Sequence, residues 1–396
     1  MQSVRADFPF LDRRINGRPV VYLDSAATTQ KPRQVIDCLT NLYSSGISNV
    51  HRAVNVLADE VTQAFEAGRA SIADFIGAYP TEIVFVSNAT QALNVVCNSL
   101  VRDRRPRVLT TTLEHHSNLL PWVQKASVEW IPWTADGSLD MQALRSGVRA
   151  RPDLVAVSAA SNFLGSLSPV EEIAQLCREY GVPLLIDASQ SIGHRLHDVG
   201  RLGCDYLVFS GHKAYGPSGI GVLYAKTGTT GTLSPMLLGG SMVKEVHADS
   251  FVLNSVPYRF EAGTPNIEGV IGLAAALDYL GSLGLEQVAE HECRLVQRAK
   301  QRLSAIPRVQ LLGPPPGVPC APIVAFQIEG LSANAVAKAL GNRANIIVRA
   351  GFHCAQPAHD TLGVGPTVRA SFGLYNTFED VDQLAATLES ICALIH

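Results

Sequence analysis

The sequence lacks the cysteine spacings that mark metal sites. Its eight cysteines include no CxxC pair, so zinc and iron–sulfur ligation are disfavoured and we expect no metal site. Most of these cysteines lie in apolar patterns, where a free thiol behaves as a small hydrophobic group. The exception is Cys354, which lies in a loop between Gly351 and Pro357.

An excess of charge of one sign is also missing. The formal net charge is −3, which gives no electrostatic basis for binding nucleic acid or an anionic membrane. No apolar run reaches the ~18 residues that span a bilayer, and the first residues contain no apolar targeting segment. We therefore expect a cytoplasmic protein with neither nucleic acid nor membrane as a partner.

The glycine-rich phosphate motifs GxGxxG and GxxxxGK[ST] are absent, so dinucleotide-binding and P-loop functions have no support. What the sequence does have is a length of 396 residues and 47% hydrophobic content. These values predict a well-buried globular protein with two domains.

Strand-like and helical patterns alternate through the first two thirds of the chain. This alternation predicts an α/β fold with a mainly parallel sheet that is covered on both faces. We expect strands at residues 20–23, 82–86, 107–112, 128–132, 154–158, 184–187, 206–209 and 222–224. Helices are expected at residues 56–76, 91–101 and 169–180. Ser168 and Glu171 are expected to cap the last of these helices, and Gly181 to end it.

Beyond residue 260 the pattern becomes that of a smaller α+β domain. Two long helices, at 267–283 and 285–303, precede the Gly-Pro-Pro-Pro-Gly turn. Strands at 323–328, 346–349 and 367–371 then alternate with helices at 333–340 and 379–394. We expect a large domain over residues 16–265. Residues 1–15 and 266–396 would form the small domain, with the interdomain helices and the cysteine loop.

The stretch YLVFSGHKAYGPSGIGVLY places Lys213 between two apolar strands. Burial disfavours the ammonium form of such a lysine and favours a neutral amine that attacks carbonyl groups. Asp187 ends the apolar run LLID, where a buried carboxylate needs a partner such as a pyridinium N–H. These two residues together predict a pyridoxal phosphate site.

Other polar residues follow expected strand ends, where each has a structural as well as a functional interpretation. Asn88 or Thr90 begins a helix whose N-terminus suits a phosphate, although either could be only a cap. Of His115 and His116, at most one is expected to face a cleft. Asn162 could be a simple turn former.

The segment RAGFHCAQP holds Cys354 beside His353 and near Arg349. Loop exposure and adjacent positive charge lower a thiol pKa, so Cys354 is a candidate nucleophile, although for this segment in isolation an idle loop thiol is also a reasonable interpretation. Arg369 lies within an expected strand and needs a carboxylate from the protein or from a substrate.

Taken together, these segments resemble the cysteine desulfurases of the class V aminotransferase family, which are fold-type I pyridoxal phosphate enzymes. The resemblance is strongest to group II, the SufS/CsdA type. It extends over nearly the whole chain and includes YLDSAAT, NVHRAV, EHHSNLLPW, SGHKAYGPSGIGVLY, EAGTPN and RAGFHCAQP. Only 369 − 354 = 15 positions separate Cys354 from Arg369, which is similar to the short cysteine loop of group II.

The resemblance implies catalytic roles for Lys213 as the covalent cofactor ligand, His115 as a ring-stacking acid/base, and Cys354 as the acceptor of sulfur. It implies cofactor contacts from Ala89, Thr90, Asn162, Asp187, Gln190, Ser210, His212 and, from the neighbouring subunit of a homodimer, Thr264. It implies substrate contacts from Arg369, His51, Arg52 and Ala27. L-Cysteine would become L-alanine, and the Cys354 persulfide would pass to an acceptor of the SufE/CsdE kind, which fits iron–sulfur cluster assembly.

Two other functions remain open at this point. A selenocysteine lyase or related β-lyase would share the fold, and a non-catalytic sulfur carrier or scaffold would keep it without the reaction. Phe352 departs from the resemblance, because the subgroup usually has histidine or glutamine there, and this change bears on proton handling in the loop.

Overall fold

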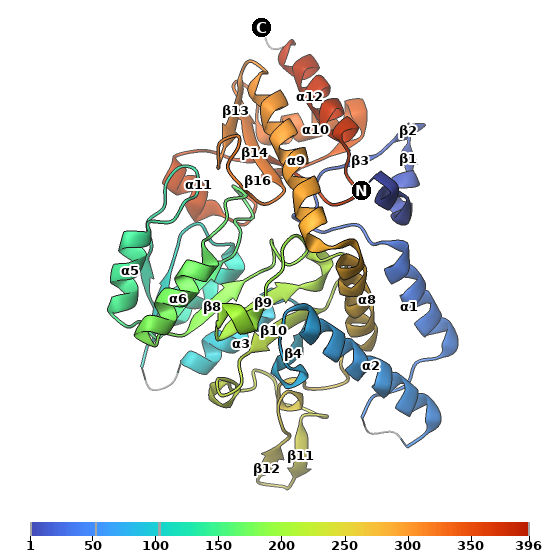
Figure 1. Cartoon of the computed structure of the whole chain (residues 1–396), viewed down its shortest axis with the longest axis vertical. Coiled ribbons are helices and arrows are strands. Elements are labelled where there is room, and N and C mark those ends of the chain that lie inside the picture. Colours follow the sequence, from blue (N-terminus) through green and yellow to red (C-terminus); the bar gives the residue numbers. More distant parts are fainter. Residues whose placement is uncertain (1, 52–53, 102–103, 395–396) are drawn as a thin grey trace.

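A seven-stranded sheet forms the centre of the computed structural model, which describes residues 2–51, 54–101 and 104–394 (Figure 1). The strand order is β4-β10-β9-β8-β7-β5-β6. Strands β6, β5, β7, β8 and β9 run parallel, whereas β10 is antiparallel to both β9 and β4. The prediction of an α/β fold with a mainly parallel sheet is therefore confirmed. The strands are β4 (Ile83–Val86), β5 (Arg107–Thr110), β6 (Ser127–Trp130), β7 (Leu154–Ser158), β8 (Leu184–Asp187), β9 (Tyr206–Ser210) and β10 (Gly221–Ala225).

Both faces of this sheet are buried, which explains why its strands are continuous apolar runs. Alternate residues of β7 to β10 point to opposite faces, because side chains alternate along a strand. One set packs with α2 (Val56–Phe75), α6 (Val170–Tyr180) and α8 (Ile267–Leu283). The other set packs with α3 (Ala89–Leu100) and α4 (Leu120–Lys125).

Helix α6 corrects one detail of the sequence prediction. Ser168 does not cap it, because the Ser168 hydroxyl donates to the Ser158 carbonyl oxygen at 2.7 Å instead. The helix begins after Pro169 without a side-chain cap, and Glu171 stabilises its first turn through charge rather than through a capping box. Gly181 ends the helix at φ 64°, as predicted.

A second, four-stranded antiparallel sheet has the order β13-β14-β17-β16. Its core includes residues of α9, α10 and α12, and α9 continues from α8 at a bend near Gly284 (Figure 1). The elements are β13 (Val309–Leu312), β14 (Ile323–Ile328), β16 (Arg349–Gly351), β17 (Thr367–Ser371), α9 (Leu285–Ser304), α10 (Ala333–Ala344), α11 (Gln356–Leu362) and α12 (Phe378–Cys392).

The N-terminal segment contributes to this second sheet region. Strand β3 (Val21–Tyr22) pairs in parallel with β15 (Ile346–Ile347), and Val21 and Leu23 lie in the core of the smaller unit. The division into residues 16–265 against 1–15 and 266–396 stays a proposal. The pairing of β3 joins it to the smaller unit, whereas Val4, Phe8 and Leu11 belong to the core cluster of the seven-stranded sheet.

The remaining elements lie around these two units. Helix α8 is apolar because it is buried between α1, α2 and the sheet. Together with α9 it has the length and composition of a membrane span, but the pair is bent by 80° and no single helix of the described ranges meets that test. The other elements are α1 (Arg33–Ser45), α5 (Met141–Arg149), α7 (Val199–Leu202), β1 (Arg14–Ile15), β2 (Arg18–Pro19), β11 (Val243–Val246), β12 (Phe251–Leu253), and the 3-10 helices η1 (Gln2–Asp7), η2 (Pro9–Asp12), η3 (Pro80–Glu82), η4 (His116–Asn118), η5 (Gly211–Lys213), η6 (Thr230–Thr232) and η7 (Tyr258–Phe260).

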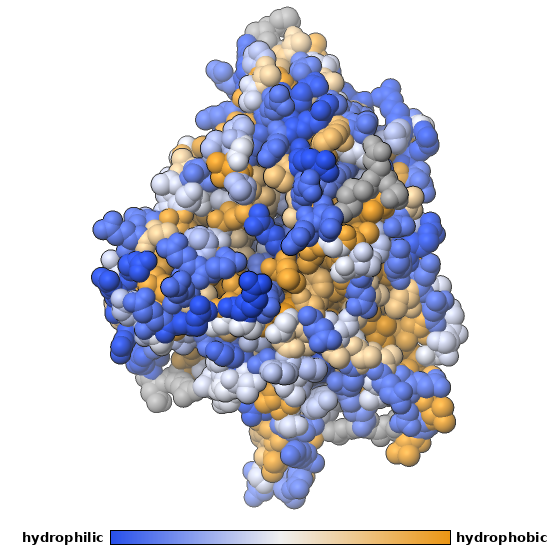
Figure 2. Space-filling view, viewed as in Figure 1, coloured by the Kyte–Doolittle hydropathy of each residue, from blue (hydrophilic) through white to orange (hydrophobic). Residues whose placement is uncertain are grey.

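The hairpin of β11 and β12 projects from the molecule (Figure 1). Its exposed side chains include Val246, Phe251 and Val252. In the view of Figure 2, polar side chains cover most of the molecular surface, and apolar side chains are visible near the junction of α8 and α9. These two strands form a sheet of their own, and the three side chains make an exposed apolar surface on it.

Candidate active site

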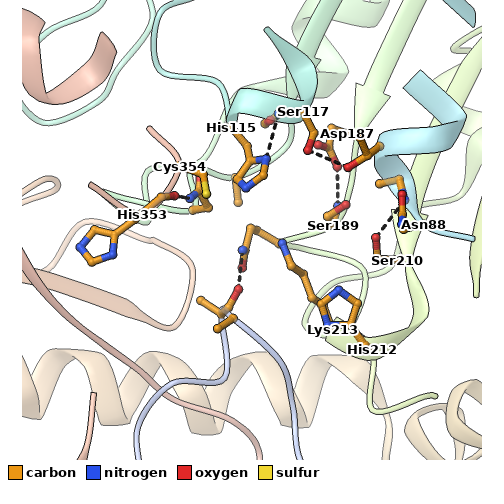
Figure 3. A pocket seen from close by; sticks show the side chains of 18 of the residues that line it. Asn88, His115, Ser117, Asp187, Ser189, Ser210, His212, Lys213, His353 and Cys354 are labelled. Atoms are coloured by element: carbon orange, nitrogen blue, oxygen red, sulfur yellow. Dashed lines mark hydrogen bonds between the residues drawn. The ribbon is translucent and has the colours of Figure 1, made fainter. Parts of the chain in front are cut away.

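A cavity of about 270 Å³ opens at the carboxyl ends of the parallel strands, where β7, β8 and β9 end at Ser158, Asp187 and Ser210 (Figure 3). Such a sheet edge is the usual ligand site of open α/β folds. The cavity brings together twelve of the residues predicted from the sequence. They are Ala27, Ala89, Thr90, His115, Asn162, Asp187, Gln190, Ser210, His212, Lys213, Cys354 and Arg369.

Three predicted residues are not part of this constellation. Thr264 is exposed and does not line the cavity. His51 also lies elsewhere, with its Nε2 2.8 Å from a carboxylate oxygen of Glu66. Arg52 lies outside the described residues. A single chain therefore does not place Thr264 or His51 beside Lys213.

Lys213 ends the short helix η5, directly after β9. Burial is the main cause that lowers the pKa of its amine to about 8, and Arg369 and Arg349 add to this effect. The negative charges of Asp187 and Cys354 oppose it. A much larger fraction of Lys213 is thus the neutral, nucleophilic amine at neutral pH than for an exposed lysine.

The part of the cavity beside the N-terminus of α3 has the features of a phosphate site. Asn88 caps helix α3 by accepting from the Gln91 N–H at 3.0 Å. Because Asn88, Ala89 and Thr90 line the cavity, the positive end of this helix dipole lies at the cavity wall. The Ala89 N–H donates to the Ser210 hydroxyl at 2.9 Å, which links this helix end to the end of β9. Thr90 and His212 complete this part of the lining.

Several buried polar atoms in the lining have no hydrogen-bond partner among the residues that the structure describes. They include Asn162 Oδ1, Ser189 Oγ and Arg369 Nε. Unpaired buried polar groups are costly unless a ligand satisfies them. Together with Asp187 and the helix end, these atoms fit a polar aromatic ligand that carries a phosphate and an adjoining carboxylate, as pyridoxal phosphate with an amino acid does.

His115 faces the cavity as the first of the two histidines. Its Nδ1 accepts a hydrogen bond from the Ser117 N–H at 3.1 Å (Figure 3). Burial is the main cause that lowers the pKa of His115 to about 3, followed by the charge of Lys213. The ring is therefore neutral, and because Nδ1 accepts, its proton lies on Nε2.

The Cys354 loop corrects the expectation for His353. Cys354 is exposed and lines the cavity, but His353 is buried, and its ring projects away from the other labelled side chains (Figure 3). Its Nε2 lies 2.9 Å from the Thr367 hydroxyl. Burial lowers the pKa of His353 to about 2, so His353 is neutral and does not supply the positive charge expected beside the thiol. Arg349, Arg369 and Lys213 are the lining residues that carry positive charge.

Arg369 is buried under the cavity and held at two points. One amino group donates to the Asn162 carbonyl oxygen at 2.7 Å, and the other lies 3.2 Å from Asp24 Oδ1. Asn162 in turn donates from Nδ2 to the His353 carbonyl oxygen at 2.6 Å. The amide oxygen of Asn162 is buried and has no hydrogen-bond partner among the described residues, and its contact with a ring or substrate stays a prediction.

Glu114 is a supporting residue that the sequence reasoning missed. Its buried carboxylate accepts from the Ser158 N–H at 3.0 Å, from the Ser158 hydroxyl, and from Asn118 Nδ2 at 2.7 Å. Burial raises the pKa of Glu114 to about 7. Its position directly before the histidine pair was the one available signal. Ser117, Ser158 and Ser189, which also line the cavity, carried no such signal.

Comparison with known proteins agrees with this site. The chain matches the family described as aminotransferase class-V over residues 21–384. A probable cysteine desulfurase of Halalkalibacterium halodurans is 42% identical over 98% of this chain and 97% of that protein. A cysteine desulfurase of Synechococcus elongatus is also 42% identical over 99% of this chain, which spans 63% of the length of that relative.

A solved structure agrees as well. The cysteine desulfurase CsdA (S-sulfonic acid) from Escherichia coli superimposes with a TM-score of 0.90 at 34% identity, covering 100% of this chain and 98% of that chain. This likeness extends the family assignment to the group II type. The chain therefore belongs to the aminotransferase class-V family and, within it, to the pyridoxal-phosphate-dependent cysteine desulfurases.

Proposed function

We propose that the chain converts L-cysteine to L-alanine and retains the sulfur as a persulfide on Cys354. The observation that carries this proposal is that Lys213, His115, Arg369 and Cys354 line one cavity. A covalent cofactor ligand, a neutral acid/base, a carboxylate receptor and a thiol are the four groups that the reaction needs.

Pyridoxal phosphate, when bound, supplies an electron sink for the bonds around the substrate Cα. Lys213 would hold it covalently through its neutral amine, and Asp187 would pair with its ring nitrogen. The N-terminus of α3, with Thr90, Ser210 and His212, would hold its phosphate. His115 would lie on the ring, with Gln190, Asn162 and Ala89 around it.

Arg369 would bind the substrate carboxylate. Its guanidinium is anchored by the Asn162 carbonyl oxygen and by Asp24, so Arg369 is already held in the cavity lining before substrate binds. Asp24 balances part of its charge at 3.2 Å, so Arg369 stays charged when buried. Ala27 lies in the same lining and would limit the space beside the substrate.

The sulfur transfer would proceed from the Cys354 thiolate. Its Sγ attacks the substrate sulfur, an S–S bond forms, and the Cβ–S bond of cysteine breaks. The electron pair of that bond goes to the substrate Cβ, which takes up a proton and becomes the methyl group of alanine. His115 would donate or accept protons at Nε2, and Lys213 would move the proton at Cα.

The exposed position of Cys354 suits delivery of the persulfide to a protein acceptor. We propose an acceptor of the SufE/CsdE kind, iron–sulfur cluster assembly as the pathway, and the cytoplasm as the location. We also propose a homodimer, in which Thr264, His51 and Arg52 approach the neighbour's site. The exposed apolar hairpin of β11 and β12 supports an interface, and a fully active monomer in sedimentation at assay concentration would contradict it.

The test of the proposed function is the variant Cys354→Ala. It is expected to keep the visible cofactor band and to bind L-cysteine, but to form no protein persulfide and at least tenfold less alanine. Substantial alanine from cysteine would instead indicate a thiol-independent lyase. L-Selenocysteine is the comparison substrate, because selenide leaves more easily; equal losses on both substrates would mean that Cys354 is structural.

A further inference from the structure

Two residues of the Cys354 loop that carry a Cβ have unfavourable backbone conformations. Gly351, His353 and Cys354 have φ values of 125°, 53° and 55°, and the left-handed region is unfavourable for residues with a Cβ. Such strain persists only where the surroundings fix it. The position of the Cys354 thiol in the cavity therefore depends on contacts between this loop and the residues packed around it.

Three hydrogen bonds connect this loop to the larger unit, on both sides of Cys354. Asn162 Nδ2 donates to the His353 carbonyl oxygen at 2.6 Å. The His116 N–H donates to the Cys354 carbonyl oxygen at 2.8 Å, and the Gln356 N–H donates to His116 Nε2 at 3.2 Å. His116 thus holds the loop with both its backbone and its ring.

The support beneath His116 is rigid. His116 begins η4, and Asn118 at the end of η4 donates to Glu114 at 2.7 Å and accepts from the Trp122 indole at 3.0 Å. Glu114 is in turn bonded to the end of β7 through the Ser158 N–H. A chain of hydrogen bonds therefore connects His116 to the end of β7, which lies beside Asp187.

We infer that His116, the second histidine of the pair, is the positioning residue of the Cys354 loop and holds the thiol in the reacting position through its imidazole. This inference rests on the proposed role of Cys354 as the sulfur acceptor. His115 lines the cavity, whereas His116 contacts the loop. Burial lowers the pKa of His116, which favours the neutral ring that accepts from Gln356.

The experiment compares His116→Phe and His116→Gln in the cofactor-loaded enzyme. Phenylalanine keeps the ring without an acceptor, and the glutamine amide oxygen can accept from Gln356. Loss of one hydrogen bond corresponds to a change on the order of tenfold. We expect His116→Phe to slow alanine and persulfide formation from L-cysteine by about that factor, and His116→Gln to restore at least half of the loss.

A second reaction separates positioning of the thiol from damage to the site. Exchange of the Cα proton of L-alanine in D2O needs Lys213 and Arg369 but not Cys354, so His116→Phe is expected to leave its rate unchanged. Hydrogen exchange of the peptide that contains Gln356 is expected to accelerate. Wild-type cysteine turnover in His116→Phe, or an equal fall in both reactions, would overturn the inference.

Controls keep this result distinct from failure of the proposed function. If the wild-type enzyme formed no persulfide on Cys354, the proposed function would fail before the variants were compared. If His116→Phe did not load cofactor, His116→Gln and His116→Asn would decide. Asparagine is too short to reach Gln356, so it is expected to be slow, and equal rates for these two variants would overturn the inference.

Discussion

Arg69 offers a sharp test of how the larger unit supports the phosphate end of the cavity. Its guanidinium is buried and bonded to Glu261 at 2.8 and 2.9 Å, to Glu66 at 3.0 Å, and to the Ile83 carbonyl oxygen at 2.9 Å. It also lies 4.4 Å from the centroid of the Phe85 ring. Glu261 accepts from the Phe85 N–H at 2.8 Å, so this cluster anchors β4, which leads to α3.

We predict that Arg69→Met lowers the free energy of unfolding by about 3–5 kcal/mol, because Glu261 is left buried without its cation. With about 2.1 cal/mol/K of unfolding entropy per residue, this loss lowers Tm by about 4–6 °C. Thermal unfolding followed by circular dichroism measures the shift. Cofactor retention during dialysis is expected to fall as well, because β4 positions the N-terminus of α3.

The matched control is Arg104→Met. Arg104 also pairs with an acid, Asp153, but its side chain is 67% exposed, so its loss is expected to leave Tm unchanged within error. The double variant Arg69→Met/Glu261→Gln is expected to lose less than the sum of the single changes. A Tm shift below 1 °C in Arg69→Met, or equal shifts for Arg69 and Arg104, would refute the reasoning.

Two further predictions concern pH. Because the pKa of Lys213 is lowered to about 8, the rate of cofactor loading of the apoenzyme is expected to rise about tenfold between pH 7 and pH 9 and then to level off. The visible absorbance of the bound cofactor measures this rate. Arg369→Gln removes a charge that lowers the pKa of Lys213, so this variant is expected to move the midpoint of the pH profile upward. A midpoint that does not move would contradict the assigned cause. The folded-state pKa of His353 is about 2, below its ordinary 6.5, so the unfolded chain binds a proton that the folded chain does not. Stability is then lost as the pH falls below 6.5, by about 1.4 kcal/mol per unit. His353→Leu is expected to flatten this dependence in denaturant titrations, and an unchanged slope would show that other groups cause it.

The sequence could predict those features that depend on local patterns. Asp187 and Ser210 are the last residues of buried strands that are otherwise apolar, and such strands place a final polar residue at the carboxyl edge of a parallel sheet. Lys213 follows from the same pattern, since the turn after β9 has little freedom between two core strands.

What could not be predicted depends on contacts between distant segments. The Asn162 amide bonds a carbonyl group 191 positions away, and no local pattern encodes that pairing. The side chain of His353 turns toward Thr367 because a buried hydroxyl there satisfies it, which reverses the role expected from its place beside Cys354. Ser168 had the composition of a cap, but a tertiary partner, the Ser158 carbonyl oxygen, competed for its hydroxyl.

The pairing of β3 with β15 has a consequence for biosynthesis. Val21 is among the first buried residues to be made, yet its strand partner Ile346 follows 325 residues later (346 − 21). At translation rates of about 5–20 residues per second, that interval is roughly 16–65 s. The seven-stranded sheet is complete once residue 225 has been made. The nascent chain therefore contains every strand of the large sheet well before β3 gains its partner, and chaperones would encounter β3 as an unpaired apolar strand during that interval.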